Sequence, residues 1–310
     1  MNALIIGAGG FVGGYLINDL LTNGFSVFAT KLPFEKIEGT RFTVLDLDIS
    51  DSDKIRDVIL LSRPDVIFHL AALSSVALSW NNIKTTFNVN VIGAINLLNC
   101  VKEINKEIKI LLIGSSEEYG FNAETIMPVR EVSPVNPSNP YAISKLSQTY
   151  LGKMYAEAFN MNIIMMRAFN HIGPKQPEGF VVPDFCKQIV EIERGNCSPI
   201  LTTGNLNAKR DFTDVRDITA GYILCAKLGK SGKIYNIGSG KATAISDILR
   251  SLVALSSTEI SIETDYEKRR PIDVPIVEAD ISQINLDTGW KPQIGLQQSL
   301  KDTLDFWRNK

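Results

Sequence analysis

The sequence predicts an α/β fold in which a doubly wound parallel sheet is followed by a smaller mixed α/β domain. Short apolar runs alternate with helical patterns through the first half of the chain. These runs are continuous rather than alternating, which is typical of parallel strands covered by helices on both faces. The rhythm breaks after Asn170, where Pro and Gly become frequent. We therefore expect one domain over 1–169 and a second mainly over 170–310, with a segment near 205–230 returning to the first.

The first half supplies the strands of the predicted sheet and the helices that cover it. Right-handed crossovers should join successive strands. The expected strands are Ala3–Ile6, Ser26–Thr30, Arg41–Leu45, Val66–His69, Ile108–Ile113 and Asn162–Arg167. The expected helices are Phe11–Leu21, Asp53–Ser62, Thr85–Glu103 and Tyr141–Phe159.

The second half has shorter and less regular elements, which we expect to lie over the carboxyl edge of the sheet. The expected strands are Pro199–Thr203, Lys233–Ile237 and Ser261–Glu263. The expected helices are Asp184–Arg194, Val215–Lys227, Ile245–Leu255 and Leu296–Arg308.

Composition excludes several classes of protein. The chain has 310 residues, 45% of them hydrophobic, and a formal net charge of −2, so it lacks the basic excess of nucleic-acid or anionic-membrane binders. No apolar run reaches the roughly 20 residues of a membrane span, and the N-terminus lacks a secretion signal, which favours a cytoplasmic protein. With two histidines in the chain, a histidine-based metal site is not expected. The cysteines are expected to be reduced and mostly buried: Cys100, Cys186, Cys197 and Cys225.

A glycine-spaced turn follows the first predicted strand. Glycines at 7, 10 and 13 permit a tight turn, close approach of a pyrophosphate and close packing of helix on strand. The phosphates would then meet the N–H groups at the start of the helix. A glycine-rich turn without a ligand is the alternative. The candidate cofactor-binding residues in this turn are Gly7, Gly10, Phe11, Val12 and Gly13.

The end of the second strand bears on the form of the dinucleotide. It reads Thr30-Lys31, with no acidic residue to accept from a ribose 2′-hydroxyl. Lys31 could instead meet a 2′-phosphate, which favours NADP(H) and leaves NAD(H) open. Lys31 could also be an ordinary surface lysine.

Two further strand ends can contribute to the same site. A carboxylate after the third strand can accept from an adenine amine, or can begin a helix. Small residues after the fourth strand let a cofactor pass close to the sheet edge, although they also suit a plain loop. The candidates here and in the next helix are Asp48, Ile49, Leu70, Ala71, Ala72 and Asn90.

A Ser, a Tyr and a Lys form the candidate catalytic group. Asn139-Pro140 suits a helix start, and Tyr141 and Lys145 then lie on one helix face. A free tyrosine has a pKa near 10, and a nearby ammonium lowers it towards the working range. Ser115, at the end of the fifth strand, can hydrogen-bond a reacting oxygen. A Tyr-x-x-x-Lys spacing alone arises often by chance, but it gains force after the glycine turn.

With these residues in place, the chain resembles the extended short-chain dehydrogenases/reductases that act on nucleotide sugars. The resemblance covers nearly the whole chain, through GAGGFVG, HLAA, SSEEYG, YAISK, RAFNHIGP, RDFTDVRD and RRPIDV in the family's order. LTTGNLNAKRDFTDVRD and GWKP look like the branch that handles GDP-mannose derivatives, and within it the GDP-6-deoxy-4-keto-D-mannose reductases, which form GDP-D-rhamnose.

This resemblance implies NAD(P)H-dependent reduction of the C4 ketone of a GDP-4-keto-6-deoxy sugar, in surface-polysaccharide biosynthesis. Tyr141 would give the proton, Ser115 would position the oxygen, and Lys145 would tune Tyr141 and hold the nicotinamide ribose. The alternatives are a GDP-4-keto-heptose reductase and a GDP-mannose 4,6-dehydratase that uses Glu117 as base. The short segment from Lys31 to Arg41 lacks the Arg-rich insertion of those dehydratases, which favours the reductase. A catalytically idle dinucleotide-binding protein is a further alternative.

The resemblance also implies the substrate contacts and the assembly. Arg210 and Arg270 would bind the diphosphate and nearby ribose, or could belong to ordinary ion pairs. A lysine of the related dehydratases is replaced by Asp184, and Lys187 is its substitute one turn later. The helices Thr85–Glu103 and Tyr141–Phe159 would form a four-helix bundle in a homodimer. The candidate substrate-binding residues are Ser74, Ser75, Ser116, Glu117, Asn170, Asp184, Lys187, Arg210, Arg270 and Asp273.

Overall fold

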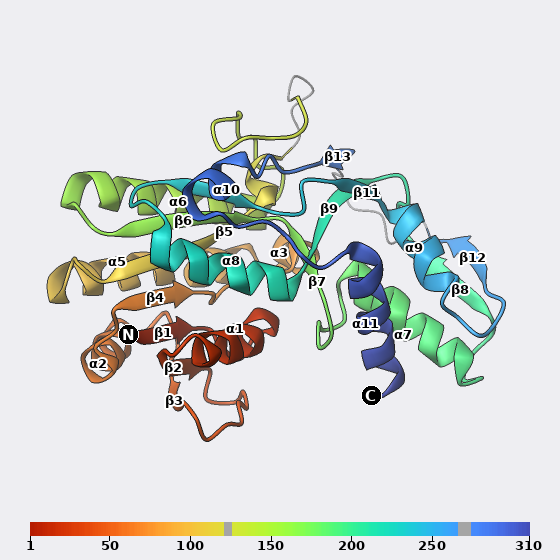
Figure 1. Ribbon diagram of the computed structural model, residues 1–310, viewed down its shortest axis with the longest axis horizontal. Helices are drawn as coiled ribbons and strands as arrows, with labels where there is room; N and C mark the ends of the chain where they lie inside the picture. Colours follow the sequence, from red (N-terminus) through yellow and green to blue (C-terminus); the bar gives the residue numbers. More distant parts are fainter. Residues whose placement is uncertain (121–125, 266–273) are drawn as a thin grey trace.

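The large sheet is parallel and contains seven strands in the order β10-β6-β5-β4-β1-β2-β3 (Figure 1). The computed structural model describes residues 1–120, 126–265 and 274–310. The strand order reverses between β1 and β4, so the carboxyl ends of these strands lie at a topological switch point, where α/β sheets bind ligands. The strands are β1 (Asn2–Ile6), β2 (Ser26–Lys31), β3 (Thr43–Asp46), β4 (Val66–His69), β5 (Lys109–Ser115), β6 (Ile163–Ala168) and β10 (Ile234–Ile237).

Helices cover both faces of this sheet, as expected for buried parallel strands. One apolar core lies between the sheet and α1, α8 and α10, and includes Leu16, Tyr222 and Ile284. The second core lies on the opposite face, under α2, α5 and α6, and includes Ile55 and Leu97. These helices are α1 (Phe11–Thr22), α2 (Ser52–Ser62), α5 (Gly93–Ile104), α6 (Pro140–Phe159), α8 (Val215–Leu228) and α10 (Ser282–Thr288).

The predicted helix Thr85–Glu103 is a composite in the structure. It consists of α4 (Ile83–Phe87), the π-helical turn η1 (Asn88–Ile92) and α5. A π-turn widens a helix by one residue and is frequent at functional sites. Here it contains Asn90, which is fully buried. A short helix before it, α3 (Val76–Asn81), was not predicted.

The C-terminal half builds a second lobe, seen at the right of Figure 1. Its core lies among α7, α9 and α11 and contains Phe185, Leu249 and Trp307. Four of its strands, β7, β9, β11 and β13, were not predicted from the sequence. The elements of this lobe are β7 (Asn170–Ile172), α7 (Val181–Glu193), β8 (Ile200–Thr203), β9 (Lys209–Asp214), β11 (Ala242–Ala244), α9 (Ile245–Val253), β12 (Ser261–Thr264), β13 (Ile276–Val277) and α11 (Leu296–Arg308).

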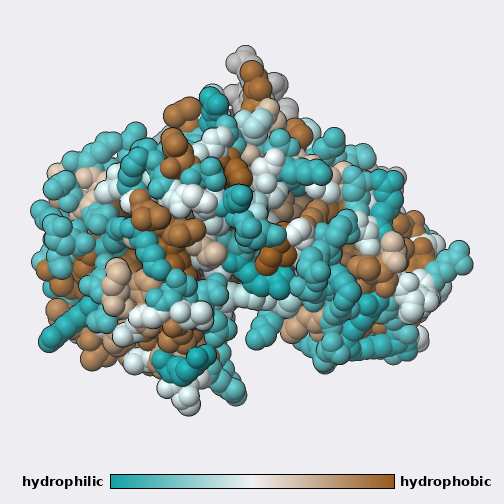
Figure 2. All heavy atoms as spheres, viewed as in Figure 1, coloured by the Kyte–Doolittle hydropathy of each residue, from teal (hydrophilic) through white to brown (hydrophobic). Residues whose placement is uncertain are grey.

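The two lobes share chain segments. β10 pairs with β6 in the large sheet, and α8 packs against α1. The α/β fold with a smaller mixed lobe is confirmed, and the division near residue 170 remains our proposal for the domain boundary. Figure 2 shows an indentation between the lobes. In the described ranges, no helix is both long and apolar enough to cross a bilayer.

The cysteines are mostly buried, as predicted. Cys100, Cys186 and Cys225 are buried free thiols, but Cys197 is exposed. Cys197 follows the end of α7, where a short turn leads to β8, so its side chain has no core to enter.

Candidate active site

The three catalytic candidates meet at the carboxyl end of β5 and the start of α6. Asn139 caps α6, accepting from the Ala142 amide at 2.8 Å, and Pro140 occupies the first turn as predicted. Ser115, Tyr141 and Lys145 are all buried, and the Ser115 side chain hydrogen-bonds Tyr141. The chain therefore brings a hydroxyl, a phenol and an amine into one enclosed site.

The predicted lowering of the Tyr141 pKa does not occur in this structure. Burial is the largest influence and raises the pKa of Tyr141, and the Glu117 and Glu118 carboxylates raise it further. The Ser115 hydrogen bond acts in the opposite direction. The Lys145 ammonium donates to the Ile113 carbonyl at 2.7 Å and to Gln148 at 3.1 Å rather than to the phenol. Tyr141 is thus held protonated, as a proton donor must be.

Burial lowers the pKa of Lys145 to about 8, while Glu118 acts to raise it. Since the folded-state pKa lies below the ordinary value, the folded protein binds fewer protons than the unfolded chain between that pH and about 10.4. The contribution of Lys145 to the free energy of unfolding should therefore rise with pH across this window.

The same pKa predicts a pH dependence of catalysis. We expect kcat, which needs the Lys145 cation, to fall as pH rises through about 8. In Lys145→Arg the guanidinium stays charged, so whatever activity remains should lose this limb. An unchanged alkaline limb in that variant would contradict the assignment.

Glu117 lies beside this group. It is partly buried in a 3-10 turn, η2 (Ser116–Glu118), and its carboxylate accepts from Asn139 at 2.9 Å. Its neighbour Ser116 is buried. The carboxylate thus faces the same helix start that carries Tyr141.

Glu118 holds the strand end and α6 together. It is fully buried and accepts from the Ser115 amide at 2.9 Å and from Thr149 at 3.0 Å. Its other oxygen accepts from Arg167 at 2.8 Å, in an ion pair with side-chain exposures of 2% and 0%. Arg167 also stacks over the Tyr119 ring, 4.7 Å from its centroid. This network fixes the backbone that carries Ser115.

The glycine turn has the shape that a dinucleotide needs. Gly7 has a φ of +85°, and a Cβ there would come within 2.6 Å of the Ala71 backbone. The Gly7 amide donates to the Thr30 hydroxyl at 3.2 Å, and the Ala8 amide donates to the Thr30 carbonyl at 2.7 Å. A glycine at this position therefore permits both the tight turn and the close packing of the loop after β4, as a dinucleotide-binding turn requires. Phe11 and Val12 begin the helix that follows.

Lys31 is not a free cation at the end of β2. Its ammonium pairs with Asp46 at 2.6 Å and donates to the Leu32 carbonyl at 3.3 Å. Asp46 ends the adjacent strand β3, and the parallel register places it opposite Lys31. The predicted preference for NADP(H) depended on an unpaired charge at Lys31, and in the structure this charge is paired with Asp46.

The other cofactor candidates occupy neighbouring strand ends. Asp48 accepts from the amide and hydroxyl of Ser50, and Asp51 rather than Asp48 caps α2. Ile49 is buried against Gly93. Leu70 and Ala71 donate their amides to the Ile6 carbonyl, each at 2.9 Å, which ties this loop to the turn. Ala72 follows them and is partly buried.

The Asn90 side chain is used within the protein. It accepts from the Leu73 amide at 2.9 Å and donates to the Leu73 carbonyl at 3.2 Å and the Ser144 hydroxyl at 2.9 Å. It therefore joins the loop after β4 to α6. A direct contact of Asn90 with a cofactor remains a prediction.

The substrate candidates are spread over several elements. Ser75 caps α3 by accepting from the Leu78 amide, and Ser74 is exposed beside it. Asn170 begins β7 next to β9, where Arg210 is buried and donates to its own strand's Lys209 carbonyl. Nearby, Arg216 forms ion pairs with Asp214 and Asp302. Arg270 and Asp273 lie outside the described residues.

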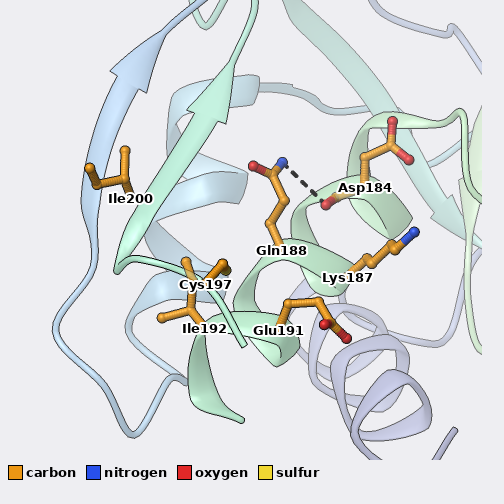
Figure 3. Close-up of a pocket in the computed structure, with 7 residues that line it drawn as sticks. All are labelled: Asp184, Lys187, Gln188, Glu191, Ile192, Cys197 and Ile200. Atoms are coloured by element: carbon orange, nitrogen blue, oxygen red, sulfur yellow. Dashed lines mark hydrogen bonds between the residues drawn. The ribbon is translucent and has the colours of Figure 1, made fainter. Parts of the chain in front are cut away.

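Asp184 and Lys187 line a shallow pocket on α7 (Figure 3), of about 390 Å³, together with Gln188, Glu191, Ile192, Cys197 and Ile200. The Lys187 ammonium pairs with Glu178 at 2.7 Å, and the Asp184 carboxylate accepts from the Gly179 amide at 2.8 Å. In the described chain, none of their hydrogen bonds reaches Ser115, Tyr141 or Lys145. Their role in binding a substrate remains a prediction.

Comparison with known proteins assigns the family. Residues 4–303 match the family model described as GDP-mannose 4,6 dehydratase. The chain belongs to this family. It is 30% identical over 263 residues to the GDP-6-deoxy-D-mannose reductase of Pseudomonas aeruginosa, covering 85% of this chain and 86% of that protein. It is 27% identical to GDP-mannose 4,6 dehydratase 1 of Arabidopsis thaliana, covering 98% of this chain and 88% of that protein.

Solved structures agree with this assignment. RMD from Pseudomonas aeruginosa complexed with NADPH matches with a TM-score of 0.87 and 29% identity, over 100% of this chain and 99% of that one. The UDP-glucose 4-epimerase of Thermotoga maritima, with UDP-glucose, matches with a TM-score of 0.88 and 26% identity over 100% and 99%. The predicted membership in the nucleotide-sugar branch of the extended short-chain dehydrogenases/reductases is confirmed. The chain is an oxidoreductase of this GDP-mannose dehydratase-type family.

Several residues that shape the site were not predicted from the sequence. Arg167 and Thr149 reach Glu118 from β6 and α6, and the Ser79 hydroxyl accepts from the Tyr141 amide at 3.3 Å. His69 ends β4 with both ring nitrogens buried and unpartnered in the described structure. Of these contacts, only the one between Arg167 and Glu118 had a signal in the sequence, namely a charged residue at the end of an apolar strand.

Gly13 and Gly14 offer a matched test of the turn. A Cβ on Gly13 would overlap the Ala8 carbonyl oxygen and lie 2.6 Å from its carbon, whereas a Cβ on Gly14 meets nothing within 4 Å. We expect Gly13→Ala to weaken the binding of NADH and NADPH at least about tenfold, because α1 and the turn at Ala8 must move apart. Gly14→Ala should bind normally and gain about 0.5–1 kcal/mol of helix stability. Fluorescence titration and thermal melts measure both effects, and normal binding by Gly13→Ala would contradict the assignment of the turn.

Proposed function

We propose that this protein reduces the C4 ketone of a GDP-4-keto-6-deoxy sugar, converting GDP-4-keto-6-deoxy-D-mannose to GDP-D-rhamnose. The observation that carries the proposal is the buried Ser115–Tyr141 hydrogen bond beside Lys145, next to a glycine turn shaped for a dinucleotide. The 30% identity to a GDP-6-deoxy-D-mannose reductase supports the choice of substrate.

Tyr141 is the proton donor in the proposed reaction. A bound reduced nicotinamide supplies the hydride that reduces the ketone carbon. Burial keeps the Tyr141 phenol protonated, so it can give its proton to the developing alkoxide. Ser115 donates a second hydrogen bond to the same oxygen, and its position is fixed by the Glu118 contact to its amide. Lys145, held by the Ile113 carbonyl and Gln148, supplies positive charge near the resulting tyrosinate.

The cofactor is proposed to lie along the carboxyl ends of β1, β2 and β4. The glycine turn would hold the pyrophosphate and Lys145 the nicotinamide ribose. A solved relative of 29% identity is complexed with NADPH, which supports a nicotinamide dinucleotide as such.

Dehydration of GDP-mannose is the second candidate. It is favoured by Glu117, whose carboxylate lies close enough to Tyr141 to raise the phenol's pKa. The Asn139 side-chain amide donates to this carboxylate at 2.9 Å, which fixes its position at the start of α6. The short segment between β2 and β3 argues for the reductase.

A homodimer through the helices around α6 is also part of the proposal. Ile143, Tyr150 and Met154 are 42%, 52% and 47% exposed and lie along one face of α6. Ile83 and Ile92, on the neighbouring composite helix, are 50% and 45% exposed. Exposed apolar side chains on neighbouring helices are the kind of surface that a second copy of the chain would cover.

A spectrophotometric assay at about 340 nm tests the activity. We expect NADH or NADPH to be consumed with GDP-4-keto-6-deoxymannose, and no reaction with GDP-mannose alone. Formation of a 4-keto sugar from GDP-mannose without added reductant would instead establish the dehydratase. Inactivity with both sugars would contradict both assignments.

A further inference from the structure

Glu35 lies beyond the end of β2 with its side chain folded back over the strand end. Its amide donates to the Leu32 carbonyl at 3.0 Å, and its Oε2 accepts from the Leu32 amide at 2.9 Å. The backbone bond closes the turn, and the bond to Oε2 fixes the direction of the side chain. Glu35 is partly buried, unlike Phe34 and Lys36 on either side of it.

The carboxylate lies against the glycine turn. A Cβ built on Gly9 would overlap Oε2 of Glu35 and lie 2.8 Å from its Cδ. Gly9 directly precedes the residue that caps α1, and the neighbouring Ala8 is hydrogen-bonded to the Thr30 carbonyl of β2. Glu35 therefore places an acidic group between the strand end and the turn, although it stands later in the chain than the strand-end position where an acid is usually sought.

Two cations lie near Glu35 in the chain, Lys31 at the end of β2 and the adjacent Lys36. Lys31 already pairs with Asp46, and Lys36 is exposed rather than partly buried like Glu35. Oε2 of Glu35 is occupied by the Leu32 amide, while Oε1 accepts no hydrogen bond from the described residues. One carboxylate oxygen is thus left to accept from a ligand at the turn.

We propose that Glu35 sets the cofactor preference of this enzyme to NAD(H). The inference rests on the proposed function in assuming that a dinucleotide binds at the glycine turn. The Glu35 carboxylate would accept charge-assisted hydrogen bonds from the hydroxyls of the adenosine ribose. A 2′-phosphate in the same place would meet this negative charge, with no unpaired lysine at position 31 to offset it. This reverses the preference predicted from Lys31.

Direct binding of NADH and NADPH to the purified full-length protein tests the proposal without any sugar substrate. In fluorescence titrations at fixed ionic strength, the wild type should bind NADH at least about tenfold more tightly than NADPH. Glu35→Gln should bring the two dissociation constants within about threefold, and Glu35→Lys should favour NADPH. Glu38→Gln is the matched control, since it removes an exposed charge from the same segment, and its ratio should equal that of the wild type. Lys31→Ala should leave the ratio within about threefold of the wild-type value.

Three results would overturn the proposal. Tighter binding of NADPH by the wild type, lost in Lys31→Ala, would return the choice to the lysine. A wild-type ratio that survives in both Glu35 variants would assign the preference to other residues while leaving the proposed function intact. Failure of the wild type to bind either dinucleotide would overturn the proposed function as well.

Discussion

Replacement of Tyr141 by Phe is expected to lower kcat for ketone reduction by about 10²–10⁴-fold, the usual contribution of a general acid. The phenol is buried and hydrogen-bonded to Ser115, so the change removes the proton and little volume. Binding of the dinucleotide should be nearly unchanged, because the glycine turn is untouched. The measurement is steady-state kinetics beside a fluorescence titration of NADH and NADPH.

Tyr150→Phe is the matched control for this change. Tyr150 lies on the same helix, is 52% exposed, and should tolerate loss of its hydroxyl without effect on kcat. If Tyr141→Phe kept more than about a tenth of the wild-type kcat, Tyr141 would not be the proton donor. Loss of cofactor binding together with kcat would point to a structural role instead. Full binding with no turnover would also exclude an idle dinucleotide-binding protein.

Replacement of Glu118 by Gln is expected to have the largest effect on stability. The change leaves the buried Arg167 guanidinium without its ion-pair partner, which typically costs about 3–5 kcal/mol. It also weakens the acceptor of the Ser115 amide, so kcat should fall in the folded fraction as well. Urea or thermal unfolding, followed beside kinetics, measures both consequences.

A double variant separates charge from packing in this network. In Glu118→Gln/Arg167→Gln no unpaired charge is buried, so we expect it to be less destabilised than the sum of the two single variants. Lys153→Met, which breaks an exposed pair with Glu157 on α6, should change stability little. Additive effects at 118 and 167 would show that the pair is not coupled as the structure implies.

Much of the fold was predictable because local signals agreed with it. The predicted strand Val66–His69 has the observed bounds, and α6 begins at the predicted Asn139-Pro140 start. Apolar runs and caps are local features that survive in the final structure. The π-turn at Asn88–Ile92 was not predictable, since its buried Asn90 bonds to Leu73 and Ser144, which are distant from it in the chain.

The site was predictable in its motifs and less so in its electrostatics. Ser115, Tyr141 and Lys145 meet as expected, but the sequence could not weigh burial against the charge of Lys145, and burial prevails in the pKa of Tyr141. Lys31 looked unpaired because Asp46 stands on another strand, and only the parallel register brings them together.

The central claim is tested most directly by following the hydrogen that the cofactor gives up. The purified enzyme would receive GDP-4-keto-6-deoxymannose and NADH or NADPH deuterated at C4 of the nicotinamide, and the sugar would be analysed by NMR and mass spectrometry. A reductase predicts one cofactor oxidised for each sugar consumed, with deuterium at C4 of a 6-deoxyhexose. Absence of net cofactor oxidation, with GDP-mannose converted to a 4-keto product in a parallel reaction, would contradict it.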